Sequence, residues 1–170
     1  MAYKSLPKDR LDLLKKISDQ ALLRAWRIVT AESCTGGGVA QALTDLEGSS
    51  SWFECGLVTY SNEMKQKLLL VQAETLSAYG AVSQQTVEEM ARGALLQSGV
   101  ELAVAISGIA GPGGGSAEKP VGTVWFAWAV KKGGMESVCQ LFEGDRGEVR
   151  EQAIDFALEG LLRQLGSATS

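Results

Sequence analysis

Two short apolar segments, each running straight into a glycine-rich turn, constrain the fold of this 170-residue chain more than any other feature. Residues 27–31 are rich in β-branched side chains and lead through three consecutive glycines, 36–38, into an apolar pattern with helical spacing. Residues 102–106 are apolar throughout, as in a strand buried on both faces, and lead into residues 107–115, which include five glycines. Strand, tight turn and helix in succession favour an α/β fold.

The remaining patterns supply the other layers of the domain. Asp145 and Glu148 have the spacing of a capping box before a long closing helix. The other expected elements are helices over 11–22, over 63–70 and after Ser83, and strands over 53–60, 121–130 and 136–142. This order predicts a single domain over residues 1–170, a three-layer α/β/α domain with a mixed sheet that includes an antiparallel hairpin near the C-terminal end.

Composition narrows the functional classes. Hydrophobic residues make up 45% and charged residues 21%, as in a globular domain that folds alone or as a small homo-oligomer. The net charge is −4 and the basic residues are scattered, which argues against direct binding of nucleic acid. The polar residues 1–10 lack the apolar core of a secretion signal, and no apolar run has the length of a membrane span. We therefore expect a cytoplasmic protein with no membrane partner.

The chain has no histidine. This excludes a Ser-His-Asp triad, a Cys-His dyad and any histidine-based metal site. The three cysteines are widely spaced and form no C-x-x-C pair, so we expect them to be reduced rather than to bind zinc. Hydrolytic chemistry would therefore use Lys, Tyr, Asp or Glu as the base. We expect neither a metal nor a cofactor.

The first candidate segment is residues 32–38. Ser33 lies at the strand-to-helix junction, where a nucleophilic hydroxyl is exposed and the helix dipole stabilises negative charge. The backbone N–H groups of Thr35, Gly36 and Gly37 suit an anion or an oxyanion. Alternatively, Ser33 or Thr35 only caps the helix. Cys34 is a rival nucleophile, but its thiolate would need activation by a nearby cation.

The second segment contains Tyr60 and Lys65. If Asn62 caps the following helix, Lys65 falls in its first turn, where the helix dipole and burial would lower the pKa of the lysine. Such a lysine can act as general base for a serine, and Tyr60 can relay or steady the proton. The alternative is an ordinary exposed lysine and a tyrosine at a strand end; Lys67 is expected to be solvated.

The third segment is the glycine-rich loop 107–115. It matches neither G-x-G-x-x-G nor the Walker A pattern, so an NTPase is not expected. Its successive N–H groups can bind an anion or bring backbone close to a flat ring; otherwise the loop is a flexible connection. Arg146, at the start of the closing helix, can bind a phosphate or can be solvated surface. The candidate ligand-binding residues of the loop are Ser107, Gly108, Ala110, Gly111, Pro112, Gly113 and Gly114.

With these segments in order, the chain resembles the CinA C-terminal-domain family, and closely its stand-alone members, the nicotinamide-nucleotide amidases. The resemblance covers about residues 11–165 and includes every segment discussed above. It is carried by Ala31-Glu32-Ser33-Cys34-Thr35-Gly36-Gly37, Gly48-Ser49-Ser50 with Trp52-Phe53, Val58-Thr59-Tyr60-Ser61-Asn62 with Lys65, Gly80-Ala81-Val82-Ser83, Ile106-Ser107-Gly108-Ile109-Ala110-Gly111-Pro112 and Lys119-Pro120-Val121-Gly122-Thr123-Val124.

The resemblance implies an oligomeric α/β enzyme that hydrolyses nicotinamide mononucleotide to nicotinic acid mononucleotide and ammonia in pyridine-nucleotide salvage. Ser33 would be the nucleophile, with Tyr60 and Lys65 as the assisting pair. Our own hypothesis, beyond the resemblance, is that the loop 107–114 holds the ring and the ribose phosphate, with Arg146 as a weaker candidate. A second hypothesis is a non-catalytic module that binds a nucleotide or a partner in competence or DNA damage, and a third is an amidase that uses Cys34.

Overall fold

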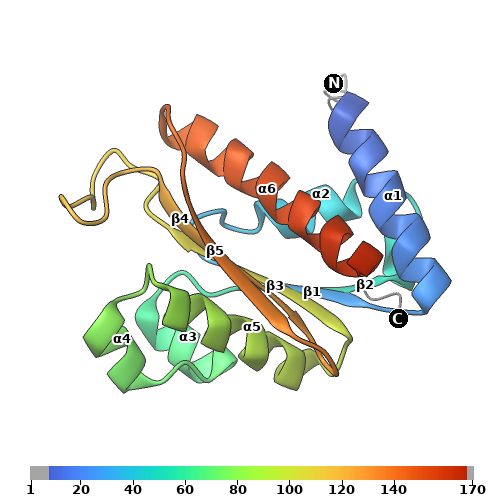
Figure 1. The fold of residues 1–170 in the computed structure, drawn as a ribbon, viewed down its shortest axis with the longest axis horizontal. Helices are drawn as coiled ribbons and strands as arrows, with labels where there is room; N and C mark the ends of the chain where they lie inside the picture. The colour runs from blue at the N-terminus through green and yellow to red at the C-terminus, as the bar shows by residue number, and fades with distance from the viewer. Residues whose placement is uncertain (1–7, 168–170) are drawn as a thin grey trace.

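The computed structural model describes residues 8–167 as three layers, with helices on both faces of one sheet (Figure 1). The described part does not include residues 1–7 and 168–170. The first of these ranges belongs to the segment that is expected to lack a secretion signal. The helices are α1 (Lys8–Arg24), α2 (Gly38–Thr44), α3 (Asn62–Leu69), α4 (Ala73–Tyr79), α5 (Gln84–Ser98) and α6 (Arg146–Ser167), with a 3-10 turn at Ser49–Ser51. The strands are β1 (Ile28–Glu32), β2 (Phe53–Val58), β3 (Leu102–Gly108), β4 (Thr123–Val130) and β5 (Met135–Leu141).

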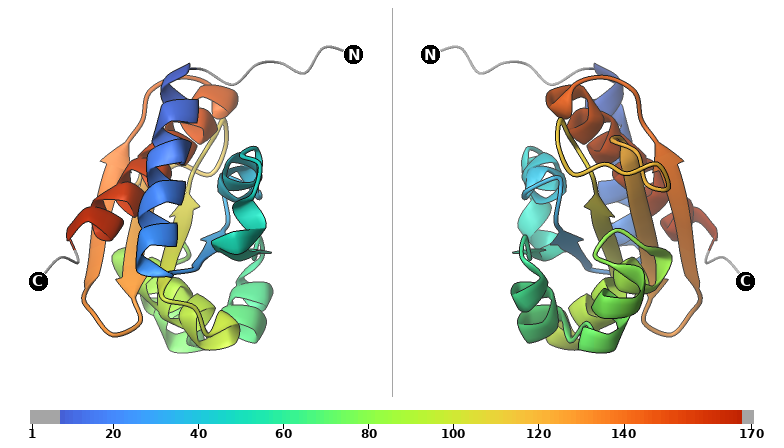
Figure 2. Two further views of the ribbon diagram at one scale, coloured as in Figure 1. Left: turned by 90° about the vertical axis from the view of Figure 1, so that its right-hand side faces the viewer. Right: turned by 90° about the vertical axis from the view of Figure 1, so that its left-hand side faces the viewer.

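The sheet has the strand order β2-β1-β3-β4-β5. The strands β2, β1 and β3 are parallel, while β4 runs antiparallel to β3 and β5 antiparallel to β4. Figure 2 shows the β4–β5 hairpin at one edge of the sheet. The sheet is therefore mixed and ends in an antiparallel hairpin, which confirms the predicted fold class.

Each face of the sheet has its own apolar core. Helices α1, α2 and α6 cover one face and α3, α4 and α5 the other (Figure 1). On the first face, Phe126 and Trp128 are fully buried in the core. Gly160 of α6 lies against Trp128 so closely that an added Cβ would come within 2.1 Å of the indole ring. A glycine is therefore needed here for α6 to approach the sheet.

Local sequence signals account for most element ends. Ser61 and Ser83 cap α3 and α5 by accepting hydrogen bonds from backbone N–H groups three residues along. The predicted capping box is also present, because Asp145 N–H donates to Glu148 and Glu148 N–H donates to Asp145. Helix α4 was not predicted, since its seven residues contain no buried side chain and therefore no strong apolar pattern. Within residues 8–167, no helix has both the length and the apolar character needed to cross a bilayer.

Candidate active site

A small cavity lies where the carboxyl ends of two neighbouring parallel strands meet the start of α3. Strand β1 ends at Glu32 and β3 at Gly108, so the residues that follow each strand come together at one edge of the sheet. Ser33 N–H donates to the carbonyl of Ile106, which ties the two strand ends to each other. The cavity has a volume of about 220 Å³ and is lined by Ser33, Cys34, Tyr60, Lys65, Ala81, Val82, Ser107, Gly108, Ala110 and Arg146.

Ser33 and Lys65 form a hydrogen-bonded pair in this cavity. The Nζ atom of Lys65 lies 3.0 Å from the Oγ atom of Ser33 and donates a second hydrogen bond, of 2.8 Å, to the carbonyl of Thr59. Both side chains are buried, Lys65 to 1% exposure and Ser33 to 9%. No salt-bridge partner for the ammonium group is found among the described residues. A serine hydroxyl thus contacts an unpaired, buried lysine.

Burial lowers the pKa of Lys65 from 10.5 to about 8. The cause is removal of the charged group from water, and the nearby Cys34 opposes it only in part. The cap of α3 is Ser61 rather than Asn62, which is the first helical residue. Lys65 still falls in the opening turns of α3. Of the two causes expected from the sequence, the helix dipole and burial, burial is the one that lowers the pKa of Lys65.

The glycine turn does not offer the amide donors that were expected there. Gly36 N–H donates to the carbonyl of Ser33, and Gly37 N–H donates to the carboxylate of Glu32. Thr35 is fully buried and its hydroxyl also donates to Glu32. Both amides thus already have acceptors within the chain, the Ser33 carbonyl for Gly36 and the Glu32 carboxylate for Gly37, which argues against their expected role as oxyanion donors.

Tyr60 and Arg146 meet at the cavity wall. The Nη2 atom of Arg146 donates to the Tyr60 hydroxyl at 3.0 Å, and its Nη1 atom donates to the carbonyl of Gly111 at 2.8 Å. Tyr60 is 62% exposed and lines the cavity that contains Lys65. The sequence analysis weighed Arg146 as solvated surface; it is exposed, but it also joins three segments around the cavity.

The glycine loop after β3 divides between two hollows. Ser107, Gly108 and Ala110 line the small cavity. Gly111 and Pro112 line a neighbouring hollow of about 700 Å³, which shares Ala110 and Arg146 with the cavity. Gly113 and Gly114 lie outside both linings. The loop itself projects beyond the end of the sheet (Figure 1).

The structure adds two lining residues that the residue-by-residue reasoning missed, Ala81 and Val82. They belong to the connection between α4 and α5, and the buried Ser107 hydroxyl donates to the Ala81 carbonyl at 2.7 Å. Neither side chain has a functional group, so only their place in the resemblance segment 80–83 could have indicated them. Ser107 therefore holds one wall of the cavity in place.

The thiol of Cys34 also lines the cavity, at 6% exposure. Its pKa is raised to about 11, first by burial and then by the neighbouring Glu32, while the backbone N–H groups of Cys34 and Thr35 oppose part of this rise. The thiol is therefore protonated near neutral pH and is a poor nucleophile.

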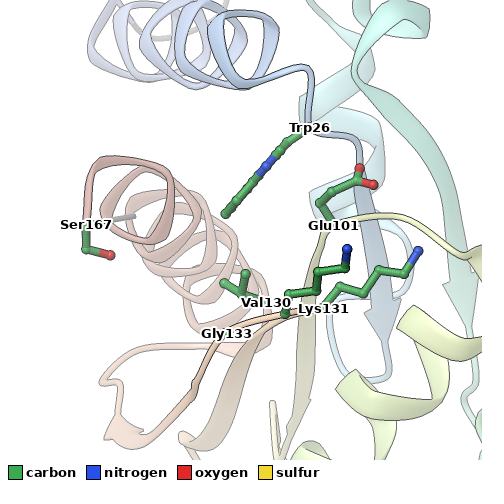
Figure 3. Close-up of a pocket in the computed structure, with 7 residues that line it drawn as sticks. Trp26, Glu101, Val130, Lys131, Gly133 and Ser167 are labelled. Atoms are coloured by element: carbon green, nitrogen blue, oxygen red, sulfur yellow. The ribbon is translucent and has the colours of Figure 1, made fainter. Parts of the chain in front are cut away.

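A larger hollow, of about 620 Å³, lies at the opposite end of the strands, between Trp26 and the β4–β5 turn (Figure 3). Glu101, Lys131 and Lys132 supply its charged groups, and both lysines are exposed. It does not place a hydroxyl beside a buried lysine. Within residues 8–167, no group of three or more His, Cys, Asp or Glu side chains is arranged to hold a metal ion.

Comparison with known proteins identifies the family. The family model described as the CinA C-terminal domain matches residues 10–165. The chain belongs to the CinA C-terminal domain family. A nicotinamide-nucleotide amidohydrolase PncC from Enterobacter agglomerans is 56% identical over 141 residues, which cover 83% of this chain and 86% of that protein. The protein of the same name from Escherichia coli K12 is 51% identical over 154 residues, covering 91% and 93%.

Solved structures of this family share the fold. The competence/damage inducible protein CihA from Agrobacterium tumefaciens superposes with a TM-score of 0.90 at 44% identity, covering 97% of this chain and all of that one. The competence damage-inducible protein A from Klebsiella pneumoniae also has a TM-score of 0.90, at 40% identity, and covers 94% and 99%. The predicted family membership is thus confirmed by both sequence and structure.

Proposed function

We propose that the protein hydrolyses the carboxamide of nicotinamide mononucleotide, giving nicotinic acid mononucleotide and ammonia for pyridine-nucleotide salvage. Two observations support this reaction. Relatives at 51–56% identity over most of the chain carry the name nicotinamide-nucleotide amidohydrolase. In addition, the Ser33 hydroxyl lies 3.0 Å from a buried lysine whose pKa is about 8. The second observation carries the proposal, because it supplies an activated nucleophile without histidine or metal.

In the proposed reaction, neutral Lys65 accepts the proton of Ser33 as the hydroxyl oxygen attacks the carboxamide carbon. The Thr59 carbonyl accepts a hydrogen bond from Lys65 and holds the Nζ atom in place. The protonated lysine then gives its proton to the departing nitrogen, so that ammonia leaves and an acyl-enzyme remains. Water, deprotonated by the same lysine, hydrolyses the ester bond to Ser33 and releases the acid product.

The backbone N–H groups of Cys34 and Thr35 are the better candidates for holding the oxyanion. Both lie beside the Cys34 thiol, whose pKa they lower, and that thiol lines the cavity. The amides of Gly36 and Gly37 are occupied, as described above. Of the three residues first expected to supply donors, only Thr35 therefore stays in the proposed set.

The two hollows suit the two ends of the substrate. A cavity of about 220 Å³ can accept a nicotinamide ring but not a whole nucleotide, and the adjoining hollow of about 700 Å³ offers room for the ribose phosphate. Arg146 lines both and offers a planar pair of donors for a phosphate. We propose that Arg146 exchanges the Tyr60 hydroxyl for the phosphate, and that Tyr60, thus released, steadies the proton on Lys65.

The decisive experiment measures ammonia release from nicotinamide mononucleotide by chelator-treated protein and by its Ser33→Ala and Cys34→Ala variants. We expect release by the native protein and by Cys34→Ala, and loss of nearly all turnover with retained binding in Ser33→Ala. Release by Ser33→Ala together with inactivation by a thiol reagent would instead support a cysteine amidase. Binding without release by any of the three proteins would support the non-catalytic module.

We further propose that the enzyme works in the cytoplasm, as one domain over residues 1–170, and as a homo-oligomer. Three free thiols fit a reducing compartment. Cell fractionation tests the location, and light scattering of the purified protein tests the oligomeric state. Unfolding in a single cooperative transition is expected for one domain.

A further inference from the structure

The carboxylate of Glu32 is fully buried and accepts five hydrogen bonds from the chain around it. One oxygen accepts from the Thr30 hydroxyl at 3.1 Å and from Ala40 N–H at 2.8 Å. The other accepts from the Thr35 hydroxyl at 2.7 Å, Gly37 N–H at 3.1 Å and Val39 N–H at 3.0 Å. No salt bridge to this carboxylate is found within residues 8–167.

These bonds close the turn that contains Ser33. The donors come from the end of β1, from the turn and from the first residues of α2, so one side chain fixes all three relative to each other. The turn needs this restraint because Gly36 and Gly37 have positive φ angles of 61° and 93°, and glycine has a large conformational freedom to lose. The cap residue Gly37 has no side chain to accept the first amides of α2, and Glu32 takes that role from five residues earlier.

The backbone of the same residue reaches the base. The carbonyl of Glu32 accepts a hydrogen bond of 2.9 Å from Thr59 N–H. The carbonyl of Thr59 in turn accepts from the Nζ atom of Lys65. Glu32 is therefore linked indirectly to both partners of the Ser33–Lys65 pair: its carboxylate holds the turn that follows Ser33, and its carbonyl holds the residue that accepts from Lys65.

We infer that Glu32 is a positioning residue that holds the Ser33 hydroxyl in line with Lys65, by using its carboxylate to anchor the turn between β1 and α2. It does not line the cavity, so it does not touch substrate. The expected effect on turnover rests on the proposed amidase function. The placement of Ser33 can be tested without substrate.

The test is Glu32→Gln, which keeps the shape of the side chain but replaces one acceptor oxygen by an NH₂ group that faces donors. Two measurements are made on folded protein: kcat and KM for nicotinamide mononucleotide, and the rate at which a fluorophosphonate reagent labels Ser33. We expect kcat and the labelling rate to fall together by about 10- to 100-fold, as for a nucleophile misplaced by up to about 1 Å, with KM changed less than about twofold.

The matched control is Glu101→Gln. Glu101 also accepts a hydrogen bond from a backbone N–H group, that of Arg27 at 3.0 Å, but at the opposite end of the strands (Figure 3). We expect it to leave kcat and labelling unchanged. If Glu32→Gln does not fold, Thr35→Val serves instead, because it removes one donor to Glu32 with little change of shape. A smaller fall in labelling, of about 3- to 10-fold, is then expected.

The outcomes separate this inference from the proposed function. If the native protein releases no ammonia but labelling of Ser33 still falls in Glu32→Gln, the proposed reaction is wrong and the positioning role stands. If kcat and labelling per folded molecule equal those of the native protein in Glu32→Gln, or in Thr35→Val where that variant is used, Glu32 is only a helix cap and the inference is refuted.

Discussion

Replacement of Lys65 by methionine should make the folded protein more stable while it abolishes turnover. Because pH 7 lies below the pKa of Lys65, most molecules of the native protein carry a charge on this side chain, although only 1% of its surface is exposed. The pKa falls from 10.5 to about 8, and each unit corresponds to about 1.4 kcal/mol, so the charged side chain costs at most roughly 3 kcal/mol of folding free energy. Methionine avoids this cost but leaves the Thr59 carbonyl without its donor, a loss of about 1 kcal/mol. The expected net gain is about 1–2 kcal/mol, or roughly 2–8 °C in Tm.

The pH dependence of this difference provides the critical check. Because the pKa of Lys65 is lower in the folded protein, the unfolded chain binds more protons between about pH 8 and 10.5, and the native protein gains stability as the pH rises through that window. The advantage of Lys65→Met should therefore be largest below pH 8 and shrink towards pH 10.5. Urea unfolding at pH 7, 9 and 10.5 measures it.

The control for this experiment is Lys67→Met, two residues along the same helix at an exposed position. It should show no comparable stabilisation and no change in kcat. A Lys65→Met variant that is less stable than the native protein at pH 7, or more stable by an amount that does not vary with pH, would refute the reasoning that Lys65 is desolvated beside Ser33.

Three further predictions follow from the same contacts. First, kcat/KM for nicotinamide mononucleotide should rise with pH through about 8, because the reaction needs neutral Lys65; a flat profile between pH 6 and 9 would exclude it as the base. Second, Arg146→Ala should raise KM for the nucleotide about 10- to 100-fold but leave KM for the nucleoside without phosphate nearly unchanged, and equal effects on both would argue against phosphate binding. Third, Gly160→Ala should lose about 1–3 kcal/mol in urea unfolding because its methyl group would overlap Trp128, whereas Gly166→Ala, whose methyl group meets nothing within 4 Å, should be neutral or stabilising.

Much of the fold was predictable because its signals are local. The apolar runs of β1 and β3, the helix after Ser83 and the capping box before α6 each depend on residues a few positions apart, and the structure confirms them. Helix α4 was missed because it buries no side chain. The three segments chosen as candidate sites do meet at one edge of the sheet, as expected for turns that follow neighbouring strands.

Three features of the site depend on contacts between distant residues, which only the tertiary structure decided. Ser33 and Lys65 are 32 residues apart, and Tyr60 and Arg146 are 86 apart, so nothing local records their hydrogen bonds. The burial that lowers the pKa of Lys65 arises in a cavity that residues of other segments, such as Ser33 and Ala81, also line. By itself, the sequence determined the order of the elements other than α4, the family resemblance and the absence of a histidine-based site. The packed structure decided that the Gly37 amide and the first amides of α2 donate to Glu32, because this carboxylate folds back onto them from five or more residues earlier in the chain.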